Sequence, residues 1–327
     1  MQIFKTPHYD FIRWRWPALA LSLLVILAGA AMLVARGLPL GVDFSGGTSV
    51  IVKFDQSVTE TQVRDAVSNV AVDVGVQQFG EPGEHEWLIR LPQTLANERG
   101  ASLEQGSTQI TQSLQKAGLP SFQVIRTEIV GPVIGADLQR RGIYATLASL
   151  AAITMYIAIR FRFSFAVGAI AATLHDIFVT LAFLIFFGYE LSLNVVAAIM
   201  TITGYSVNDT IVIFDRVREN LRSMRRDSLR DVVNVSVNQT LGRTIITAGT
   251  TFLAVLSLYL FGGEVLKGFA FTMLVGIISG TYSTVFIASA IAILLGQRRR
   301  AATAAATAPP PRPDARSGRK ARGARAS

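Results

Sequence analysis

The stretch LSLNVVAAIMTITGYSVNDTIVIF, residues 191–214, decides the class of this protein. It is apolar over a length that spans a bilayer as an α-helix, for which about 20 residues suffice. It nevertheless contains Asp209, and a carboxylate at the centre of a bilayer costs roughly 2.5–3.5 kcal/mol on insertion scales. Because intramembrane charges are rare and tend to be functional, Asp209 is the first candidate site residue.

Five further apolar runs have spanning length: 17–35, 143–159, 165–187, 244–261 and 269–295. Half of all residues are hydrophobic and 16% are charged, and the mean hydropathy is +0.42, which together exclude an ordinary soluble domain. The first run is similar to the apolar part of a signal peptide, but five more spans follow it, so we expect it to be retained as a helix. The sequence therefore predicts an α-helical membrane protein with six transmembrane helices.

The net charge of +9 is concentrated near the C-terminus, where Asp314 is the single acid among many Lys and Arg residues. Residues 297–327 are rich in Ala, Pro and Arg without apolar periodicity, which predicts a disordered basic tail. We interpret its positive charge as an anchor that keeps this end of the chain on the cytoplasmic side, and we expect no nucleic-acid partner. Contact with anionic lipid, an acidic protein or ribosomal RNA would use the same charge. The chain has no cysteine, which excludes disulfides and cysteine-held metals.

Short loops alternate between rich and poor in Lys and Arg, which predicts the orientation of the helices. Basic residues precede helix one and fill the connections between helices two and three and between helices four and five. Both termini are therefore expected in the cytoplasm. The predicted segments are a cytoplasmic N-terminus at 1–16, transmembrane helix one at 17–36, an extracytoplasmic domain at 37–138, transmembrane helices two to six at 139–296 with a cytoplasmic loop at 215–242, and a cytoplasmic tail at 297–327.

Residues 37–138 have the size of a small domain. Alternating apolar residues mark a strand at 48–54, and Thr59 and Gln62 have the spacing of a capping box that opens a helix. Strands at 72–79, 86–91 and 122–130 and a helix at 103–116 complete the set. The order βαββαβ predicts an α+β ferredoxin-like fold.

Four of the predicted membrane helices carry polar or small residues on one face. On a helical wheel, the polar residues of 191–214 form a single seam. The sets are Asn194, Thr201, Tyr205, Asn208 and Asp209 in helix four; Thr173, His175, Asp176 and Thr180 in helix three; and Arg243, Thr247, Thr250 and Ser257 in helix five. In helix six, Gly276 and Gly280 form a GxxxG pattern, which allows helix backbones to approach closely.

Asp209 and Arg243 are candidates for a charge pair between helices four and five. Asp209 lies about 8 Å from the cytoplasmic end of its span at 1.5 Å per residue, and Arg243 lies at the cytoplasmic start of the next span. Burial raises the pKa of a carboxyl group and a neighbouring arginine lowers it, so a pair whose separation changes can bind and release a proton. Spacing alone supports equally a static ion pair that joins the two helices.

Two other features receive a structural interpretation. Asp176 is interpreted as a buried carboxylate that Thr173, Thr180 or His175 satisfies, in preference to the alternative of a role in a proton relay. The stretch GVDFSGGT at 41–48 is similar to a phosphate-binding loop but lacks the lysine after the second glycine. We therefore expect its glycines to turn the chain from helix one into the first strand, and we expect no nucleotide there.

Several stretches of the chain occur together in one known family. They are GVDFSGGT at 41–48, HD at 175–176, GYSVND at 204–209, FDRVREN at 214–220 and NQTLGRTIITAGTT at 238–251. With them, the chain resembles the SecF branch of the SecD/SecF family, which belongs to the resistance-nodulation-division superfamily. Members of that family form a SecD–SecF complex in the bacterial cytoplasmic (inner) membrane that assists protein export by the Sec channel with the proton-motive force.

The resemblance implies a multi-pass, non-enzymatic accessory subunit of protein translocation. In the family, the residues that match Asp209 and Arg243 serve proton coupling. The expected secondary polar seam consists of Asn208, Tyr205, Thr201, Asp176 and Thr247. The implied partners are SecD, the SecYEG channel, SecA indirectly, unfolded polypeptide in transit and the lipid bilayer. Protons are the coupling ion, and neither a cofactor nor a metal is expected.

Two other functions fit parts of the pattern. Half of a proton-driven small-molecule or lipid efflux transporter would share the architecture, but such members usually carry much larger outer domains, repeated twice. An intramembrane aspartyl protease would use Asp176 and Asp209, but the expected Gly-x-Gly-Asp context is missing. Protein export is therefore the leading hypothesis.

Overall fold

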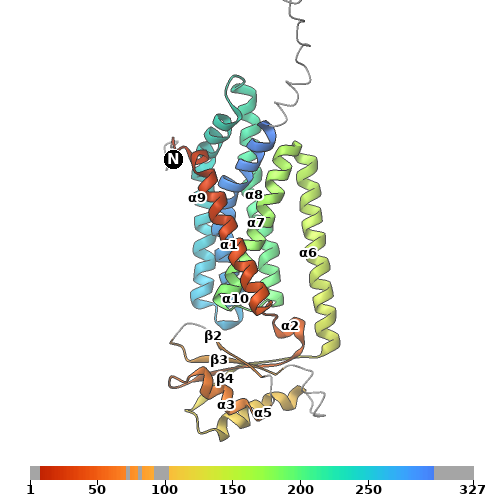
Figure 1. The fold of residues 1–327 in the computed structure, drawn as a ribbon, viewed down its shortest axis with the longest axis vertical. Coiled ribbons are helices and arrows are strands. Elements are labelled where there is room, and N and C mark those ends of the chain that lie inside the picture. Colours follow the sequence, from red (N-terminus) through yellow and green to blue (C-terminus); the bar gives the residue numbers. More distant parts are fainter. Residues whose placement is uncertain (1–7, 71–73, 80–82, 92–102, 298–327) are drawn as a thin grey trace, which may run out of the picture.

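The computed structural model of the chain describes residues 8–70, 74–79, 83–91 and 103–297. In these residues, long helices form a bundle, and a small α+β domain lies at one end of it (Figure 1). The predicted basic tail at 297–327 falls outside the described residues from position 298 onward.

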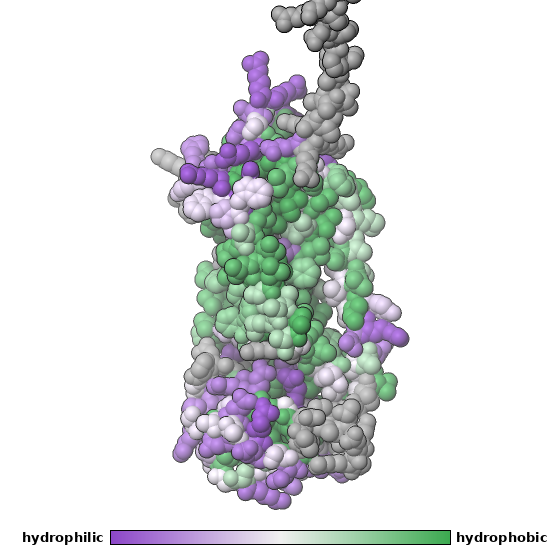
Figure 2. All heavy atoms as spheres, in the orientation of Figure 1, coloured by the Kyte–Doolittle hydropathy of each residue, from purple (hydrophilic) through white to green (hydrophobic). Residues whose placement is uncertain are grey.

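Six of the described helices are long and apolar enough to cross a membrane, which confirms the predicted number. They are η1 with α1 (Phe11–Trp14 and Arg15–Arg36), α6 (Pro132–Arg160), α7 (Phe163–Phe187), α8 (Leu193–Ser223), α9 (Leu229–Phe261), and α10 (Glu264–Ser283) with the π-helix η2 (Thr284–Ala288). On the face drawn in Figure 2, hydrophobic side chains cover the bundle, and hydrophilic side chains gather at both ends of the molecule. An exposed apolar surface of this extent is typical of a protein embedded in a bilayer.

The helices extend beyond the apolar runs that predicted them. Only 224–228 connects α8 to α9, so most of the interval 215–242, expected as a loop, is helical. Asn220 near the end of α8 donates a hydrogen bond of 2.9 Å to Ser236 of α9. Hydropathy marks the part of a helix that meets lipid, whereas these polar extensions are held by contacts with each other.

The central helix of the bundle is α10, which contacts α7, α8 and α9, whereas α6 stands at the edge (Figure 1). Two glycines of α10 face α8. A Cβ atom on Gly276 would collide with the side chain of Ile202, and one on Gly280 would lie 3.0 Å from the Cβ of Ser206. The GxxxG pattern is therefore confirmed as a surface of close helix packing.

The α+β domain has the predicted βαββαβ order, and its four antiparallel strands follow the order β2-β3-β1-β4. Its elements are β1 (Gly47–Phe54), α3 (Glu60–Val67), β2 (Gly75–Phe79), β3 (Glu86–Leu91), α5 (Leu103–Lys116) and β4 (Phe122–Val130). The capping box of Thr59 and Gln62 is present at the start of α3. The two helices cover one face of the sheet and bury its apolar side chains, so the ferredoxin-like fold is confirmed.

A short helix, α2 (Val42–Ser45), lies between α1 and β1, and it is followed by Gly46 and by Gly47, the first residue of β1. Gly46 and Gly47 have φ angles of 67° and 119°, which favour glycine over residues with a side chain. A Cβ atom on Gly135 of α6 would lie 3.2 Å from the backbone nitrogen of Gly46. The glycines of 41–48 therefore form a turn, as expected, and that turn also packs closely on α6.

The opposite face of the sheet lies toward the bundle (Figure 1), and polar contacts hold it there. Arg90 of β3 forms an ion pair with Glu190 in the connection between α7 and α8. Lys267 of α10 forms an ion pair of 3.0 Å with Glu84 in the connection between β2 and β3. The domain is thus docked on the bundle by ion pairs.

Gly276→Ala is expected to destabilise the chain by roughly 1–3 kcal/mol, because the added methyl group forces Ile202 out of its place between α8 and α10. Gly249→Ala is the matched control, since a Cβ atom at that helical position meets nothing within 4 Å. Its expected effect is neutral or stabilising by up to about 1 kcal/mol. Thermal unfolding in detergent measures both, and equal melting temperatures would contradict the packing described.

Candidate functional site

Asp209 lies near the middle of α8, on the side that faces α9. Its Oδ1 accepts a hydrogen bond of 2.7 Å from the hydroxyl group of Thr244 on α9. Its Oδ2 is buried and has no hydrogen-bond partner among the described residues. One oxygen of this intramembrane carboxyl group is therefore open to a proton or to a further donor.

The side chain of Arg243 does not bond to this carboxyl group. It is exposed, and of the described residues only Thr244 donates to Asp209. Consecutive residues of a helix point about 100° apart, so Thr244 faces α8 while Arg243 projects along the outer side of α9. The partner of Asp209 is therefore the hydroxyl group of Thr244, and not Arg243 as in the direct charge pair that the sequence suggested. Arg243 is still within electrostatic range of Asp209.

The surrounding polar residues lie on the surface of the bundle, in the groove between α8 and α9. The hydroxyl group of the half-buried Tyr205 interacts with Thr247 and Thr251 of α9. Thr201, Asn208 and Thr247 are exposed. Because polar side chains facing lipid are costly, this surface favours contact with another protein.

We call this surface the α8–α9 polar seam. It consists of Thr201, Tyr205, Asn208, Asp209, Arg243, Thr244 and Thr247. The structure brings together six residues that the sequence had singled out, from two helices, and adds Thr244. Nothing in the sequence distinguishes Thr244 from Thr247 and Thr250, yet those two threonines donate to the backbone of their own helix.

Asp176 of α7 occupies a second site and is only 1% exposed. Its Oδ1 accepts from Ser279 at 2.7 Å and lies 3.1 Å from Nδ1 of His175. Its Oδ2 accepts from Ser206 at 2.5 Å and from Ser283 at 2.8 Å. These partners come from α7, α8 and α10, so one saturated carboxyl group joins three helices.

Most partners of Asp176 differ from those expected. His175 contacts it, whereas Thr173 donates to the backbone of its own helix at 3.0 Å and the hydroxyl of Thr180 has no partner among the described residues. Sequence reasoning missed the three serines because serine in a membrane helix commonly bonds to its own turn of backbone. Its presence alone therefore gives no signal of a contact between helices.

Asp176 and Asp209 belong to separate sites. Asp209 faces α9, whereas Asp176 lies between α7, α8 and α10, and no hydrogen bond connects the two in the part of the chain that the structure describes. This geometry does not provide the shared pair of carboxyl groups that an aspartyl protease needs. The described residues also contain no group of three or more His, Asp or Glu side chains that could hold a metal ion.

Two family models match the chain. Residues 109–298 match "Protein export membrane protein SecD/SecF, C-terminal", and residues 31–58 match "SecD/SecF GG Motif". The first match contains both carboxylate sites. The second contains the glycine turn before β1.

The match to related proteins covers most of the chain. A protein translocase subunit SecF from Escherichia coli O157:H7 is 39% identical over 292 residues, which are 89% of each chain. Another from Desulfurispirillum indicum is 42% identical over 290 residues, which are 88% of this chain and 91% of the relative.

Solved structures show the same fold. The crystal structure of SecDF, a translocon-associated membrane protein from Thermus thermophilus, is 32% identical with a TM-score of 0.79. A second crystal structure, of SecDF in a super-membrane-facing form, is 34% identical with a TM-score of 0.66. The similarity to the first covers 90% of this chain but 40% of the SecDF chain, so this chain corresponds to less than half of that longer protein.

Thr244→Val is expected to destabilise the chain by roughly 1–3 kcal/mol, because it removes the one hydrogen bond that the described residues give to Asp209. Thr250→Val is the matched control, since Thr250 is exposed and donates to the backbone of its own helix. Its expected effect lies within about 0.5 kcal/mol. Thermal unfolding in detergent distinguishes the two, and an equal loss in both would show that the bond to Asp209 contributes nothing specific.

Proposed function

The chain belongs to the SecD/SecF family of protein export membrane proteins, and from that premise we propose that it couples the proton-motive force to late-stage polypeptide translocation, as a SecF-like subunit working with SecD. One observation carries the proposal. Asp209 is an intramembrane carboxyl group with one oxygen bonded to Thr244 and the other buried without a partner among the described residues. Such a group can gain or lose a proton without breaking a hydrogen-bond network. Relatives named as translocase subunits favour export over the efflux alternative.

The energy of one proton suffices for useful motion. An elementary charge that crosses 100 mV of membrane potential releases about 2.3 kcal/mol, and 1.4 kcal/mol is a factor of ten in an equilibrium constant, so the bias is about fiftyfold. A change in the distance between Arg243 and Asp209 would alter the electrostatic stabilisation of the carboxylate. Proton binding and the positions of α8 and α9 are thereby linked.

The position of the α8–α9 polar seam supports a partner inside the membrane. Asn208, Arg243 and Thr247 are exposed on it, where lipid would leave their polar groups unsatisfied. The solved SecDF chain continues well beyond the part that this chain matches. We infer that a separate SecD chain supplies the equivalent helices here and completes the Asp209 site.

The connection between α6 and the α+β domain supports a mechanical role. Strand β4 passes into α6 through the single residue Gly131, and α6 stands at the edge of the bundle (Figure 1). A tilt of α6 would carry the domain with it once the ion pairs Arg90–Glu190 and Lys267–Glu84 open. The domain would then move against a polypeptide that emerges from the channel.

We place the chain in the bacterial cytoplasmic membrane, with both termini in the cytoplasm and the α+β domain outside. The end of the bundle far from that domain holds the connection 224–228, which contains Arg225 and Arg226, as the positive-inside rule requires of a cytoplasmic end. Polypeptide leaving the SecYEG channel would therefore meet the α+β domain directly. SecA, on the cytoplasmic side, would act on this chain only indirectly.

Asp209→Asn is expected to abolish proton-dependent stimulation of late-stage translocation, because the amide still accepts the hydrogen bond of Thr244 but cannot take up a proton. Translocation into membrane vesicles that also contain SecD provides the measurement. Asp137→Asn is the matched control, since Asp137 is an exposed carboxylate paired with Arg141 of its own helix, and its effect should be small. Full stimulation in Asp209→Asn would overturn the proposal.

Joining the α+β domain to the bundle is expected to stop the stimulation reversibly. Because the chain has no cysteine, the substitutions Glu84→Cys and Lys267→Cys create a unique pair that a reducible thiol cross-linker can join. Reduction of the linker should restore activity, and each single substitution treated in the same way should remain active. Unchanged activity in the joined protein would contradict movement of the domain.

A further inference from the structure

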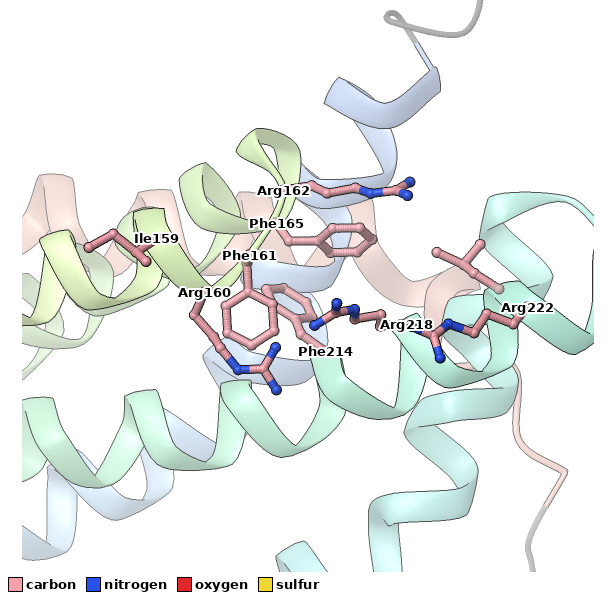
Figure 3. Close-up of a pocket in the computed structure, with 9 residues that line it drawn as sticks. Ile159, Arg160, Phe161, Arg162, Phe165, Phe214, Arg218 and Arg222 are labelled. Atoms are coloured by element: carbon pink, nitrogen blue, oxygen red, sulfur yellow. The ribbon is translucent and has the colours of Figure 1, made fainter.

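The end of the bundle farthest from the α+β domain contains a cavity with a basic lining. It lies where the turn between α6 and α7 meets α8 and has a volume of about 480 Å³. Four arginines line it, and no acidic residue does: Arg160, Arg162, Arg218 and Arg222 (Figure 3). The proton site described above lies elsewhere, between α8 and α9, and does not use these side chains.

Three of the four arginines lack an acidic partner in the part of the chain that the structure describes. Arg160 forms an ion pair of 2.7 Å with Asp215 of α8, whereas Arg162, Arg218 and Arg222 form none with a described residue. Arg218 and Arg222 are one helical turn apart on α8, a spacing at which like charges repel each other. Uncompensated positive charge is therefore concentrated at this cavity.

The start of α7 adds to the positive potential. Arg162 is the N-cap residue of α7, no side chain caps the helix, and its first turn contains no acidic residue. The N-terminus of a helix carries a partial positive charge. Backbone and side chains thus favour the same ligand, an anion with several oxygen atoms.

Apart from the arginines, the residues that line the cavity are apolar. The ring of Phe214 packs edge-to-face on those of Phe161 and Phe165, with centroid distances of 5.9 and 5.0 Å, and Figure 3 shows the arginines arranged around these rings. Ile159 and Phe163, which flank the turn, are 81% and 70% exposed. A ligand would therefore meet guanidinium groups on one side and the apolar surface of the membrane helices on the other.

We propose that this cavity binds the phosphate headgroup of an anionic phospholipid, of which phosphatidylglycerol is the example tested below. The guanidinium groups of Arg162, Arg218 and Arg222 donate to the phosphate oxygens, for which their planar forks are suited. The acyl chains leave past Ile159 and Phe163 and lie along α6. Basic pockets between transmembrane helices bind such headgroups in other proteins. The bound lipid ties the α6–α7 turn to α8.

A topological anchor alone does not account for this arrangement. The positive-inside rule requires only that short cytoplasmic loops be rich in Lys and Arg. Arg13, Arg225 and Arg226 meet that requirement; they are exposed, as are Arg162, Arg218 and Arg222, but they do not line the cavity. The arginines of the cavity come from two segments far apart in the sequence and converge over the same aromatic rings. This arrangement forms a binding site, which a topological anchor does not need.

Native mass spectrometry of the purified full chain tests the proposal, with dioleoylphosphatidylglycerol and dioleoylphosphatidylcholine as probes. The chain should retain phosphatidylglycerol in preference to phosphatidylcholine. The triple variant Arg162→Gln, Arg218→Gln and Arg222→Gln should lower the affinity for phosphatidylglycerol by about tenfold or more, because the phosphate loses its guanidinium donors. Each of the three single variants should lose part of the preference, which keeps the test valid if the triple variant does not fold.

The matched control is the triple variant Arg13→Gln, Arg225→Gln and Arg226→Gln, which removes the same charge from the same end of the bundle and should keep the preference. Glycerol 3-phosphate, added at the concentration of the lipid, separates a lipid site from a site for soluble phosphate and should not displace phosphatidylglycerol. Displacement by glycerol 3-phosphate, an equal loss in both triple variants, or no preference for phosphatidylglycerol in the unaltered chain would each overturn the proposal.

Discussion

A carboxyl group inside a membrane bundle needs hydrogen-bond donors around it, and this requirement organises the helices of the chain. Asp176 meets it completely, with partners from α7, α8 and α10. Asp209 meets it by half, through Thr244 of α9. The saturated site fixes three helices to one another. The half-saturated site leaves an oxygen atom for a proton, and we interpret it as the place where the bundle responds to the membrane potential.

The saturated site depends in turn on small residues. Gly276 and Gly280 let the backbone of α10 approach α8, which brings hydroxyl groups from both helices within reach of Asp176. Directly after Ser283, the last of these donors along the chain, the helix changes to the π-helix η2. Such segments are rare and often occur at functional sites. The centre of the bundle therefore consists of α7, α8 and α10, whereas α6 stands at the edge and is joined to the preceding α+β domain through Gly131.

Local features of this protein were predictable from its sequence, whereas contacts between helices were not. Apolar runs of spanning length predicted six helices, and the alternation at 48–54 with the capping box at Thr59 predicted the α+β domain, because each of these signals lies within one element. The serines around Asp176 gave no such signal. Likewise, whether Thr244 or Arg243 donates to Asp209 depends on how α9 is oriented about its own axis. Hydropathy does not fix that orientation when polar residues lie on the outside of the bundle. The orientation in the membrane remains a prediction from loop charges.

The exposed position of the α8–α9 polar seam underlies our proposal that a SecD chain completes the Asp209 site. A photoreactive benzophenone amino acid in place of Asn208 tests it most directly, in cells that contain both chains. Met155 on α6, which is 63% exposed, provides the comparison position at the edge of the bundle. If SecD covers the seam, position 208 should give a covalent adduct with SecD and position 155 should give none. An adduct with lipid alone from position 208, or equal SecD adducts from both positions, would contradict it.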